Sequence, residues 1–145
     1  MSRWHWPPSA VAPSRSWRTS PTSIARPTSS GRILEFGSIV LTRFPFTDLS
    51  ADKLRPALVI SRDNGRRSDV VLAFITSNTQ AAGSPDTLRI EPSAANGLKV
   101  PSVVRFDKIV TLEKQIIAGK LGDADVEFLS AAGRVFYGVF GFDRP

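Results

Sequence analysis

The order of hydrophobic and polar residues divides the chain into two parts that meet near residue 33. Residues 1–32 are rich in Ser, Pro and Arg and follow neither the two-residue period of a strand nor the 3.6-residue period of a helix. We therefore predict that this segment is disordered. From Phe36 onward, short apolar runs alternate with turn residues. That pattern predicts one compact, mostly β domain over residues 33–145.

The strongest strand signals are two nearly continuous apolar runs, RPALVIS at residues 55–61 and DVVLAFI at residues 69–75. The turn residues Asp63, Asn64 and Gly65 join them, so we expect a central hairpin that is buried on both faces. Further strands are predicted at residues 39–46, 87–90, 102–106 and 109–112. Short strands separated by Pro and Asn-Gly turns are typical of a small barrel.

The last part of the chain changes to a helical period. Gly122 and Asp123 predict the start of a helix. Apolar or small residues then recur on one side of that helix, at Val126, Leu129, Gly133, Phe136 and Phe140. The simplest interpretation of this stripe is that the helix packs against the barrel.

Composition restricts the chemistry that the domain can perform. A chain of 145 residues fits one domain. It has no Cys, and its single His, His5, lies in the N-terminal segment. Thiol nucleophiles, Cys/His zinc sites and histidine bases are therefore excluded from the folded part, and we expect no metal and no cofactor.

The formal charge of +6 is concentrated in the N-terminal segment. Five of the 19 basic residues precede the first acidic residue, Glu35, and the remaining 14 face 13 acidic residues, a balance of +1. Net charge alone thus does not predict that the domain binds nucleic acid.

The N-terminal segment admits three interpretations: a basic arm that adds affinity for nucleic acid, a transit-like leader, or translation begun upstream of the true start. We favour the last, with a start near Leu34, although Met1 is the only Met. No apolar run approaches the roughly 20 residues that cross a bilayer, and no secretory signal is recognisable. The cytoplasm is therefore the expected location.

Five motifs follow one another along the domain: FGSIVLTRFPFTD, KLRPALVIS, ITSN, GLKVPSVVRFDKI and TLEKQII. In this order they resemble the MazF/PemK (Kid-like) family of type II toxin endoribonucleases, over about residues 36–140. The resemblance implies an SH3-like β-barrel with short helices, in agreement with the predicted strands, and a homodimer. It also implies metal-independent, sequence-selective cleavage of single-stranded RNA, inhibition of translation, and an antitoxin whose disordered segment occupies the RNA groove.

Arg105 and Asp107 carry the candidate chemistry. Residues two apart in a strand project from the same face, so a guanidinium and a carboxylate can approach one phosphate. Cutting RNA without metal or imidazole requires a base for the 2′-hydroxyl and stabilisation of the phosphoryl charge. In Kid-like proteins this Arg-x-Asp pair supplies acid and base. We interpret Asp107 as the base and Arg105 mainly as the charge stabiliser, the alternative being a surface salt bridge.

Further site residues are predicted at the ends of the central hairpin. Arg55 precedes a buried strand, and the resemblance marks it as catalytic together with Thr76, whose hydroxyl can bond phosphate or sugar oxygens. The alternatives are a strand-edge ion pair for Arg55 and an ordinary turn at Thr76 and Ser77. The predicted RNA-binding residues are Arg43, Lys53, Ser77, Asn78, Lys99 and Ser102.

Two departures from the family pattern leave alternatives open. Ser38 replaces the acid that usually follows the first Gly, and residues 47–54 lack the His that Kid-like members use for positioning. Partial substitution by Asp52 or Lys53, and a site without any substitute, are both open. A catalytically inactive barrel that only binds a partner is therefore an alternative function. A gyrase poison of the CcdB type is disfavoured, because this chain ends in GFDRP and not in Trp-Gly-Ile.

Overall fold

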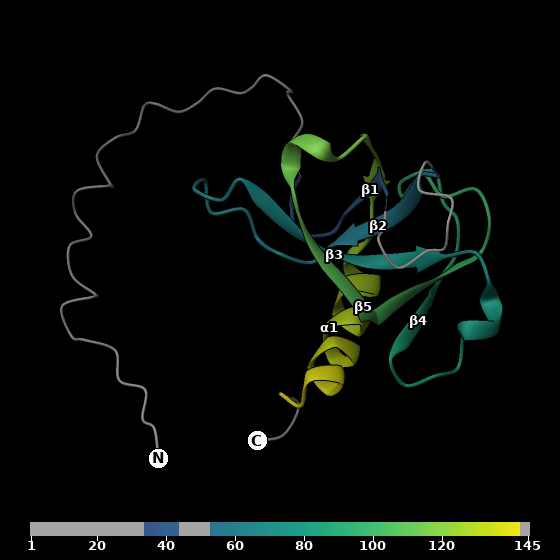
Figure 1. Cartoon of the computed structure of the whole chain (residues 1–145). Coiled ribbons are helices and arrows are strands. Elements are labelled where there is room, and N and C mark those ends of the chain that lie inside the picture. Colours follow the sequence, from purple (N-terminus) through teal and green to yellow (C-terminus); the bar gives the residue numbers. More distant parts are fainter. Residues whose placement is uncertain (1–33, 44–52, 143–145) are drawn as a thin grey trace, which may run out of the picture. The chain divides into compact units, whose positions relative to one another are not determined.

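The computed structural model describes residues 34–43 and 53–142, which belong to the unit Ile33–Pro145 (Figure 1). The strands are β1 Ser38–Thr42, β2 Arg55–Val59, β3 Asp69–Thr76, β4 Thr87–Ile90, β5 Ser102–Glu113 and β6 Gly119–Asp123. The helices are α1 Val126–Phe140 and two short 3-10 turns, η4 Thr79–Ala81 and η5 Lys114–Ile116. The predictions for residues 1–32, for the end of the first strand and for most of the 47–54 loop lie outside the described residues. Among the described residues no helix is long and apolar enough to cross a membrane.

The six strands form one antiparallel sheet in the order β4-β5-β3-β2-β1-β6, which is curled into a half-barrel. The helix α1 follows β6 in the chain. The predicted central hairpin is present as β2 and β3, in register through Ala57 opposite Phe74. Consecutive side chains of both strands are buried, at residues 57–59 and 72–75, because each face of the sheet carries a hydrophobic cluster. The predicted mostly β barrel with a C-terminal helix is therefore confirmed.

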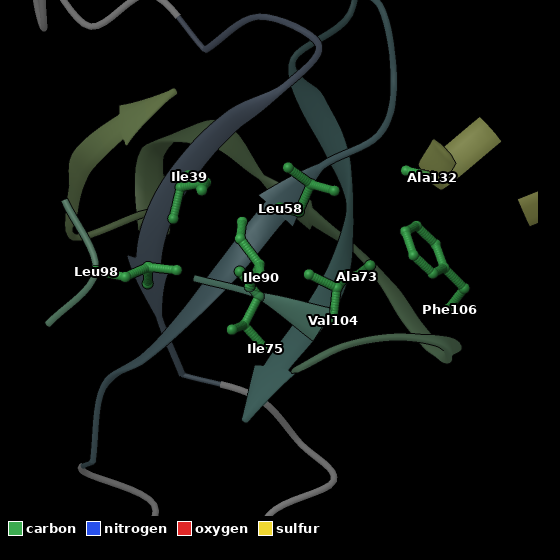
Figure 2. Close-up of a cluster of buried hydrophobic side chains, with 9 residues drawn as sticks. All are labelled: Ile39, Leu58, Ala73, Ile75, Ile90, Leu98, Val104, Phe106 and Ala132. Atoms are coloured by element: carbon green, nitrogen blue, oxygen red, sulfur yellow. The ribbon is translucent and has the colours of Figure 1, made fainter. Parts of the chain in front are cut away.

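One face of the sheet packs against α1. Figure 2 shows Leu58, Ala73, Val104 and Phe106 on this face, with Ala132 of the helix close to Phe106. The other face carries a second cluster, formed by alternate residues of β1, β2 and β3 together with Leu34 before β1 and Ile117 after η5: Leu34, Val40, Ala57, Val59, Val70, Leu72, Phe74 and Ile117. We call these the α1 face and the opposite face. The two-residue period of a strand thus decides which side chains α1 covers.

β5 is one strand of 12 residues, where the sequence predicted two strands at 102–106 and 109–112. Its register with β3 shifts between Ala73, opposite Ile109, and Phe74, opposite Arg105. The extra residues form a bulge, which increases the local twist and reverses the alternation of side chains. As a result Val104 packs on the α1 face before the bulge, and Val110 packs on the opposite face after it.

The predicted start of the C-terminal helix was wrong. Gly122 and Asp123 belong to β6, where Gly122 pairs with Ile39. The helix begins at Val126, and the carboxylate of Asp125 caps it by accepting a hydrogen bond from the backbone N–H of Phe128 at 2.7 Å. The predicted apolar stripe holds only in its middle: Leu129, Gly133 and Phe136 face the sheet or its cavity, whereas Val126 is 80% and Phe140 45% exposed.

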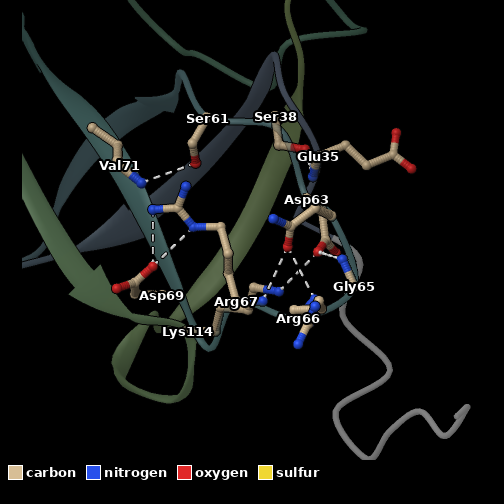
Figure 3. Close-up of polar contacts among 11 residues, drawn as sticks. Glu35, Ser38, Ser61, Asp63, Gly65, Arg66, Arg67, Asp69, Val71 and Lys114 are labelled. Carbon is tan, nitrogen blue, oxygen red and sulfur yellow. Dashed lines mark hydrogen bonds and ion pairs between the residues drawn. The ribbon is translucent and has the colours of Figure 1, made fainter. Parts of the chain in front are cut away.

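The turn between β2 and β3 is built by short polar side chains (Figure 3). Asp63 Oδ1 accepts the backbone N–H of Gly65 at 2.8 Å, and Lys114 approaches the same oxygen at 3.4 Å. Asn64 Oδ1 accepts the backbone N–H groups of Arg66 and Arg67. The bond from Gly65, and secondly the charge of Lys114, hold the pKa of Asp63 below its usual value. The predicted turn is thus stabilised by its own side chains.

Candidate functional site

The register of the sheet places Arg55, Thr76 and Arg105 on the opposite face. Ala57, Phe74 and Arg105 lie in one row across β2, β3 and β5. Arg55 precedes Ala57 by two residues and Thr76 follows Phe74 by two, so both project from the same face as that row. Adjacent strands lie about 4.8 Å apart, which brings three side chains from distant parts of the sequence to one end of the sheet.

Asp107 joins these residues through a two-pronged contact with Arg105. Arg105 Nε donates to Asp107 Oδ1 at 3.1 Å, and Arg105 Nη2 donates to Oδ2 at 2.7 Å. The two side chains are 28% and 31% exposed, so solvent and a ligand can reach the pair. We call Arg55, Thr76, Arg105 and Asp107 the candidate cluster.

The ion pair shifts the proton affinity of both partners. The hydrogen bond from Arg105 lowers the pKa of Asp107, with the charge of Arg105 adding to this and burial opposing it. The hydrogen bond to Asp107 likewise raises the pKa of Arg105, and the charges of Asp107 and Asp86 contribute in the same direction. In this structure Asp107 is therefore an anion and a weak base, and Arg105 is a cation. Asp107 gains basicity only when Arg105 turns away from it.

The same ion pair predicts a small acid-dependent change in stability. Because the folded-state pKa of Asp107 is lowered, its contribution is present above the unfolded pKa of about 3.9 and is lost as pH falls through the folded value. For a solvent-accessible pair we expect less than about 1 kcal/mol. Urea unfolding of the protein and of Asp107→Asn, between pH 6 and pH 3, measures it. The two free energies should converge toward low pH, and a constant difference contradicts the assignment.

Arg55 is half-buried at the first position of β2, opposite Thr42 of β1. Its Nε is buried without a hydrogen-bond partner among the described residues. No salt bridge joins Arg55 to an acid in the part of the chain that the structure describes. The alternative of a strand-edge ion pair thus finds no partner there. A buried donor without a partner is costly, and an anionic ligand would satisfy it.

Thr76 ends β3, and its Oγ1 accepts the backbone N–H of Asn78 at 3.0 Å. Asn78 in turn caps η4 by accepting the N–H of Gln80. These local bonds are those of an ordinary turn, as the alternative interpretation expects. The bond to Thr76 uses only an acceptor lone pair of the hydroxyl, so the hydroxyl can still donate its proton to a phosphate or sugar oxygen. Ser77 and Asn78 are exposed beside it.

The other predicted RNA-binding residues lie in three different places. Arg43 follows β1 and Lys53 precedes β2, both exposed, so they lie at the end of the sheet where Arg55 begins β2. Lys99 is exposed in the loop between β4 and β5. Ser102 is different: it is 2% exposed, and its hydroxyl donates to the carbonyl of Val100 at 2.9 Å. Ser102 shares the α1 face with Val104 by alternation, so the structure does not bring it to the candidate cluster.

Sequence reasoning missed Arg89 and Glu91, which form an ion pair of 2.6 Å at the edge strand β4. Arg89 lies opposite Val103, which lies opposite Thr76, so Arg89 projects from the face of the candidate cluster. The Arg-x-Glu spacing repeats the Arg-x-Asp spacing at 105 and 107 and was a signal that could have found the pair. The sequence alone does not reveal that the two pairs share a face.

One cavity lies away from the candidate cluster. It has about 230 Å³ and lies on the α1 face, between β2 and the helix, with Leu58, Phe106 and Leu129 among its lining residues. Arg62 lies over the ring of Phe36 at its rim, 5.9 Å from the ring centre. Most of its lining is apolar, and no residue of the candidate cluster lines it. Within the described residues no group of three or more His, Cys, Asp or Glu side chains could hold a metal ion.

Comparison with known proteins places the chain in a class of toxin. Residues 35–137 match the family described as PemK-like, MazF-like toxins of type II toxin-antitoxin systems. The chain therefore belongs to this family. It is 34% identical over 94 residues to a Mycolicibacterium smegmatis protein named "Probable endoribonuclease MazF", covering 61% of this chain and 84% of that protein. It is also 34% identical over 85 residues to the Mycobacterium tuberculosis endoribonuclease MazF6, covering 57% and 74%.

Solved structures share the fold. A mycobacterial endoribonuclease, determined in complex with its cognate antitoxin, superposes with a TM-score of 0.62 at 20% identity, over 77% of this chain and 98% of that one. The Mycobacterium tuberculosis toxin MazF-mt6 gives 0.60 at 24% identity, over 74% and 99%. MazF in a MazE-MazF structure from Deinococcus radiodurans gives 0.54 at 22% identity, over 74% and 95%. The predicted SH3-like barrel of the MazF/PemK type is thus confirmed.

Proposed function

We propose that this protein is the toxin of a type II toxin-antitoxin pair and that it cleaves single-stranded RNA without a metal, thereby inhibiting translation. The observation that carries the proposal is the meeting of Arg55, Thr76, Arg105 and Asp107 at one end of one sheet face. Family membership and the endoribonuclease names of the relatives support it.

The cluster supplies the groups that the reaction needs. An RNA phosphate competes for Arg105, whose fork fits phosphate as well as carboxylate, and thereby releases Asp107 from its ion pair. Asp107 then accepts the proton of the 2′-hydroxyl while the 2′-oxygen attacks phosphorus. Arg105 and Arg55 stabilise the charge of the pentavalent phosphorane, and the Thr76 hydroxyl orients a phosphoryl oxygen.

The products follow from this geometry. The bond from phosphorus to the 5′-oxygen breaks, and solvent protonates the leaving oxygen. One fragment therefore ends in a 2′,3′-cyclic phosphate and the other in a 5′-hydroxyl. A guanidinium with a pKa raised by Asp107 gives up its own proton reluctantly, which favours a stabilising role for Arg105 over that of an acid.

We expect purified protein to cut a long mixed-sequence RNA in the presence of EDTA, because no step uses a metal. Mapping of the fragment ends should identify 2′,3′-cyclic phosphates, and treatment that opens the cyclic ester should change the mobility of those fragments. An RNA in which every 2′-hydroxyl is methylated is the matched control and should stay intact. Cleavage of the methylated RNA, or loss of cleavage in EDTA, contradicts the mechanism.

The alternative function is an inactive barrel that binds only an antitoxin, a nucleic acid or a protein. The missing positioning His favours it, since proton transfer then depends on the ion pair alone. It predicts RNA or partner binding with no cleavage above that of an Arg105→Ala control. The same EDTA experiment therefore separates the two functions.

The partners of the proposed toxin are a cognate antitoxin and a second copy of the chain. The structures of relatives solved with antitoxin support the first. A second copy is supported by aromatic side chains on α1, where the ring of Phe136 contacts those of Tyr137 and Phe140. Tyr137 and Phe140 are 53% and 45% exposed. An exposed apolar surface of this kind is typical of protein contacts. Light scattering gives the oligomeric state directly.

A further inference from the structure

Arg89 and Glu91 form a second arginine-carboxylate pair near the candidate cluster. Arg89 Nε donates to Glu91 Oε2 at 2.6 Å, and the two side chains are 49% and 61% exposed. β4 is an edge strand of the sheet, paired only with β5 among the described strands. The pair therefore lies at the margin of the sheet, where an extended ligand can leave the face.

The orientation of Arg89 follows from the pairing of β4 with β5. Leu88 and Ile90 pack on the α1 face, so Thr87 and Arg89 project from the opposite face. Thr87 lies opposite Arg105, two residues before Arg89. With about 4.8 Å between strands and about 3.4 Å per residue, the Cα atoms of Arg89 and Arg105 are roughly 8 Å apart.

Three arginines thus follow one another across the opposite face, from Arg55 on β2 to Arg105 on β5 and Arg89 on the edge strand β4. Arg89 and Arg105 are each neutralised by a carboxylate two residues further along. Arg55 differs, because its Nε is buried without a hydrogen-bond partner among the described residues. A phosphate presents the same fork of oxygens as a carboxylate and can replace it. A polyanion with regularly spaced phosphates complements such a row better than a single anion does.

We infer that Arg89 binds a phosphate of the RNA beside the one that is cut, and that Glu91 occupies Arg89 until RNA replaces it. This extends the substrate path from the candidate cluster to the edge of the sheet, and it rests on the proposed ribonuclease function. Arg89 contributes affinity independent of base identity, because it contacts backbone and not a base edge. Glu91 acts only through Arg89: while its carboxylate holds the guanidinium, it competes with the RNA phosphate and so weakens RNA binding.

The inference predicts opposite effects for the two members of the pair. Arg89→Gln should raise the Kd for a short random-sequence RNA with every 2′-hydroxyl methylated by about 3- to 10-fold near 0.1 M salt, and should reduce the salt slope of log K by about 0.7, the value of one phosphate contact on a single strand. In cleavage assays KM should rise and kcat stay within about twofold. Glu91→Gln should lower the Kd, since it frees Arg89 and removes a negative charge.

Arg67→Gln is the matched control. Arg67 holds Asp69 at 3.0 Å in an ion pair of the same spacing (Figure 3), at the end of β3 away from Thr76. The Arg67→Gln variant removes the same charge as Arg89→Gln and should leave Kd, KM and the salt slope unchanged. A purely structural role for the Arg89–Glu91 pair predicts that both partner variants weaken binding or lower the melting temperature, and that result overturns the inference.

The outcomes separate this inference from the proposed function. If the unaltered protein neither binds the methylated RNA nor cuts unmodified RNA, the proposed function fails. If the unaltered protein binds and cuts, but Arg89→Gln matches the Arg67→Gln control in Kd and salt slope, only the role of Arg89 fails. Equal Kd values for Glu91→Gln and the unaltered protein show that Glu91 does not compete with RNA.

Discussion

Arg105→Gln is expected to lower the rate of RNA cleavage by about 10²- to 10³-fold, the usual effect of removing one group that stabilises developing oxyanion charge. The amide cannot replace the fork that now meets both oxygens of Asp107 and that a phosphate would occupy. Single-turnover cleavage of a mixed-sequence RNA measures the effect on the chemical step.

The stability of this variant should change little, because the ion pair is accessible to solvent and contributes less than about 1 kcal/mol. Thermal unfolding of Arg105→Gln therefore serves as the control that the fold is intact. Arg67→Gln removes an arginine from an ion pair of the same kind and should cleave at the normal rate. A rate for Arg105→Gln within a few-fold of normal places the reaction elsewhere on the protein.

Gly97→Ala is expected to destabilise the protein by about 3 kcal/mol or more. Gly97 has a φ of +73°, where an L side chain costs roughly 1–2 kcal/mol. A Cβ at this position would also press on the backbone of Leu121 in β6, 2.8 Å from its carbonyl carbon, and overpacking of this kind costs typically 1–3 kcal/mol. Backbone of a paired strand cannot move aside as a flexible side chain can. Urea unfolding gives the change in free energy.

Two other glycines separate the causes of this loss. Gly65 has a similar φ of +77° with no atom within 4 Å of its Cβ position, so Gly65→Ala should show the backbone strain alone. Gly119 has neither a positive φ nor a neighbour within 4 Å, so Gly119→Ala should be close to neutral. If Gly97→Ala costs no more than Gly65→Ala, the close approach of the two backbones has no energetic consequence.

Gly97 belongs to a loop whose conformation is fixed by Asn96, and this explains why the approach is so close. Asn96 is 5% exposed, accepts the backbone N–H groups of Ser93 and Leu98, and donates to the carbonyl of Glu91. On the other side, Gly122 of β6 lies against the backbone of Asn96, whose carbonyl carbon would be 2.7 Å from a Cβ at Gly122. A glycine is therefore required at position 122 because β6 passes close to the backbone of Asn96. It does not start a helix, contrary to what the sequence predicted.

Local patterns along the chain were sufficient for the central strands and for the presence of the C-terminal helix, but not for the residue at which that helix starts. The apolar runs that form β2 and β3, and the polar turn between them, depend on neighbouring residues and were predicted closely. β6 was missed because its sequence, GKLGD, has weak strand preference and pairs with β1 only through tertiary contact. The bulge in β5 likewise leaves no local signal except the interruption near Asp107.

For the site, the spacing of Arg105 and Asp107 by itself determined that a guanidinium and a carboxylate share a face, because alternation in a strand is a local property. Which other residues join them was decided only by the tertiary structure. Register between β2, β3 and β5 brings Arg55 and Thr76 to that face, turns Ser102 away toward α1, and adds Arg89 from the edge. A shift of one residue in any pairing would reverse these assignments, and no single segment of the sequence fixes a pairing with another.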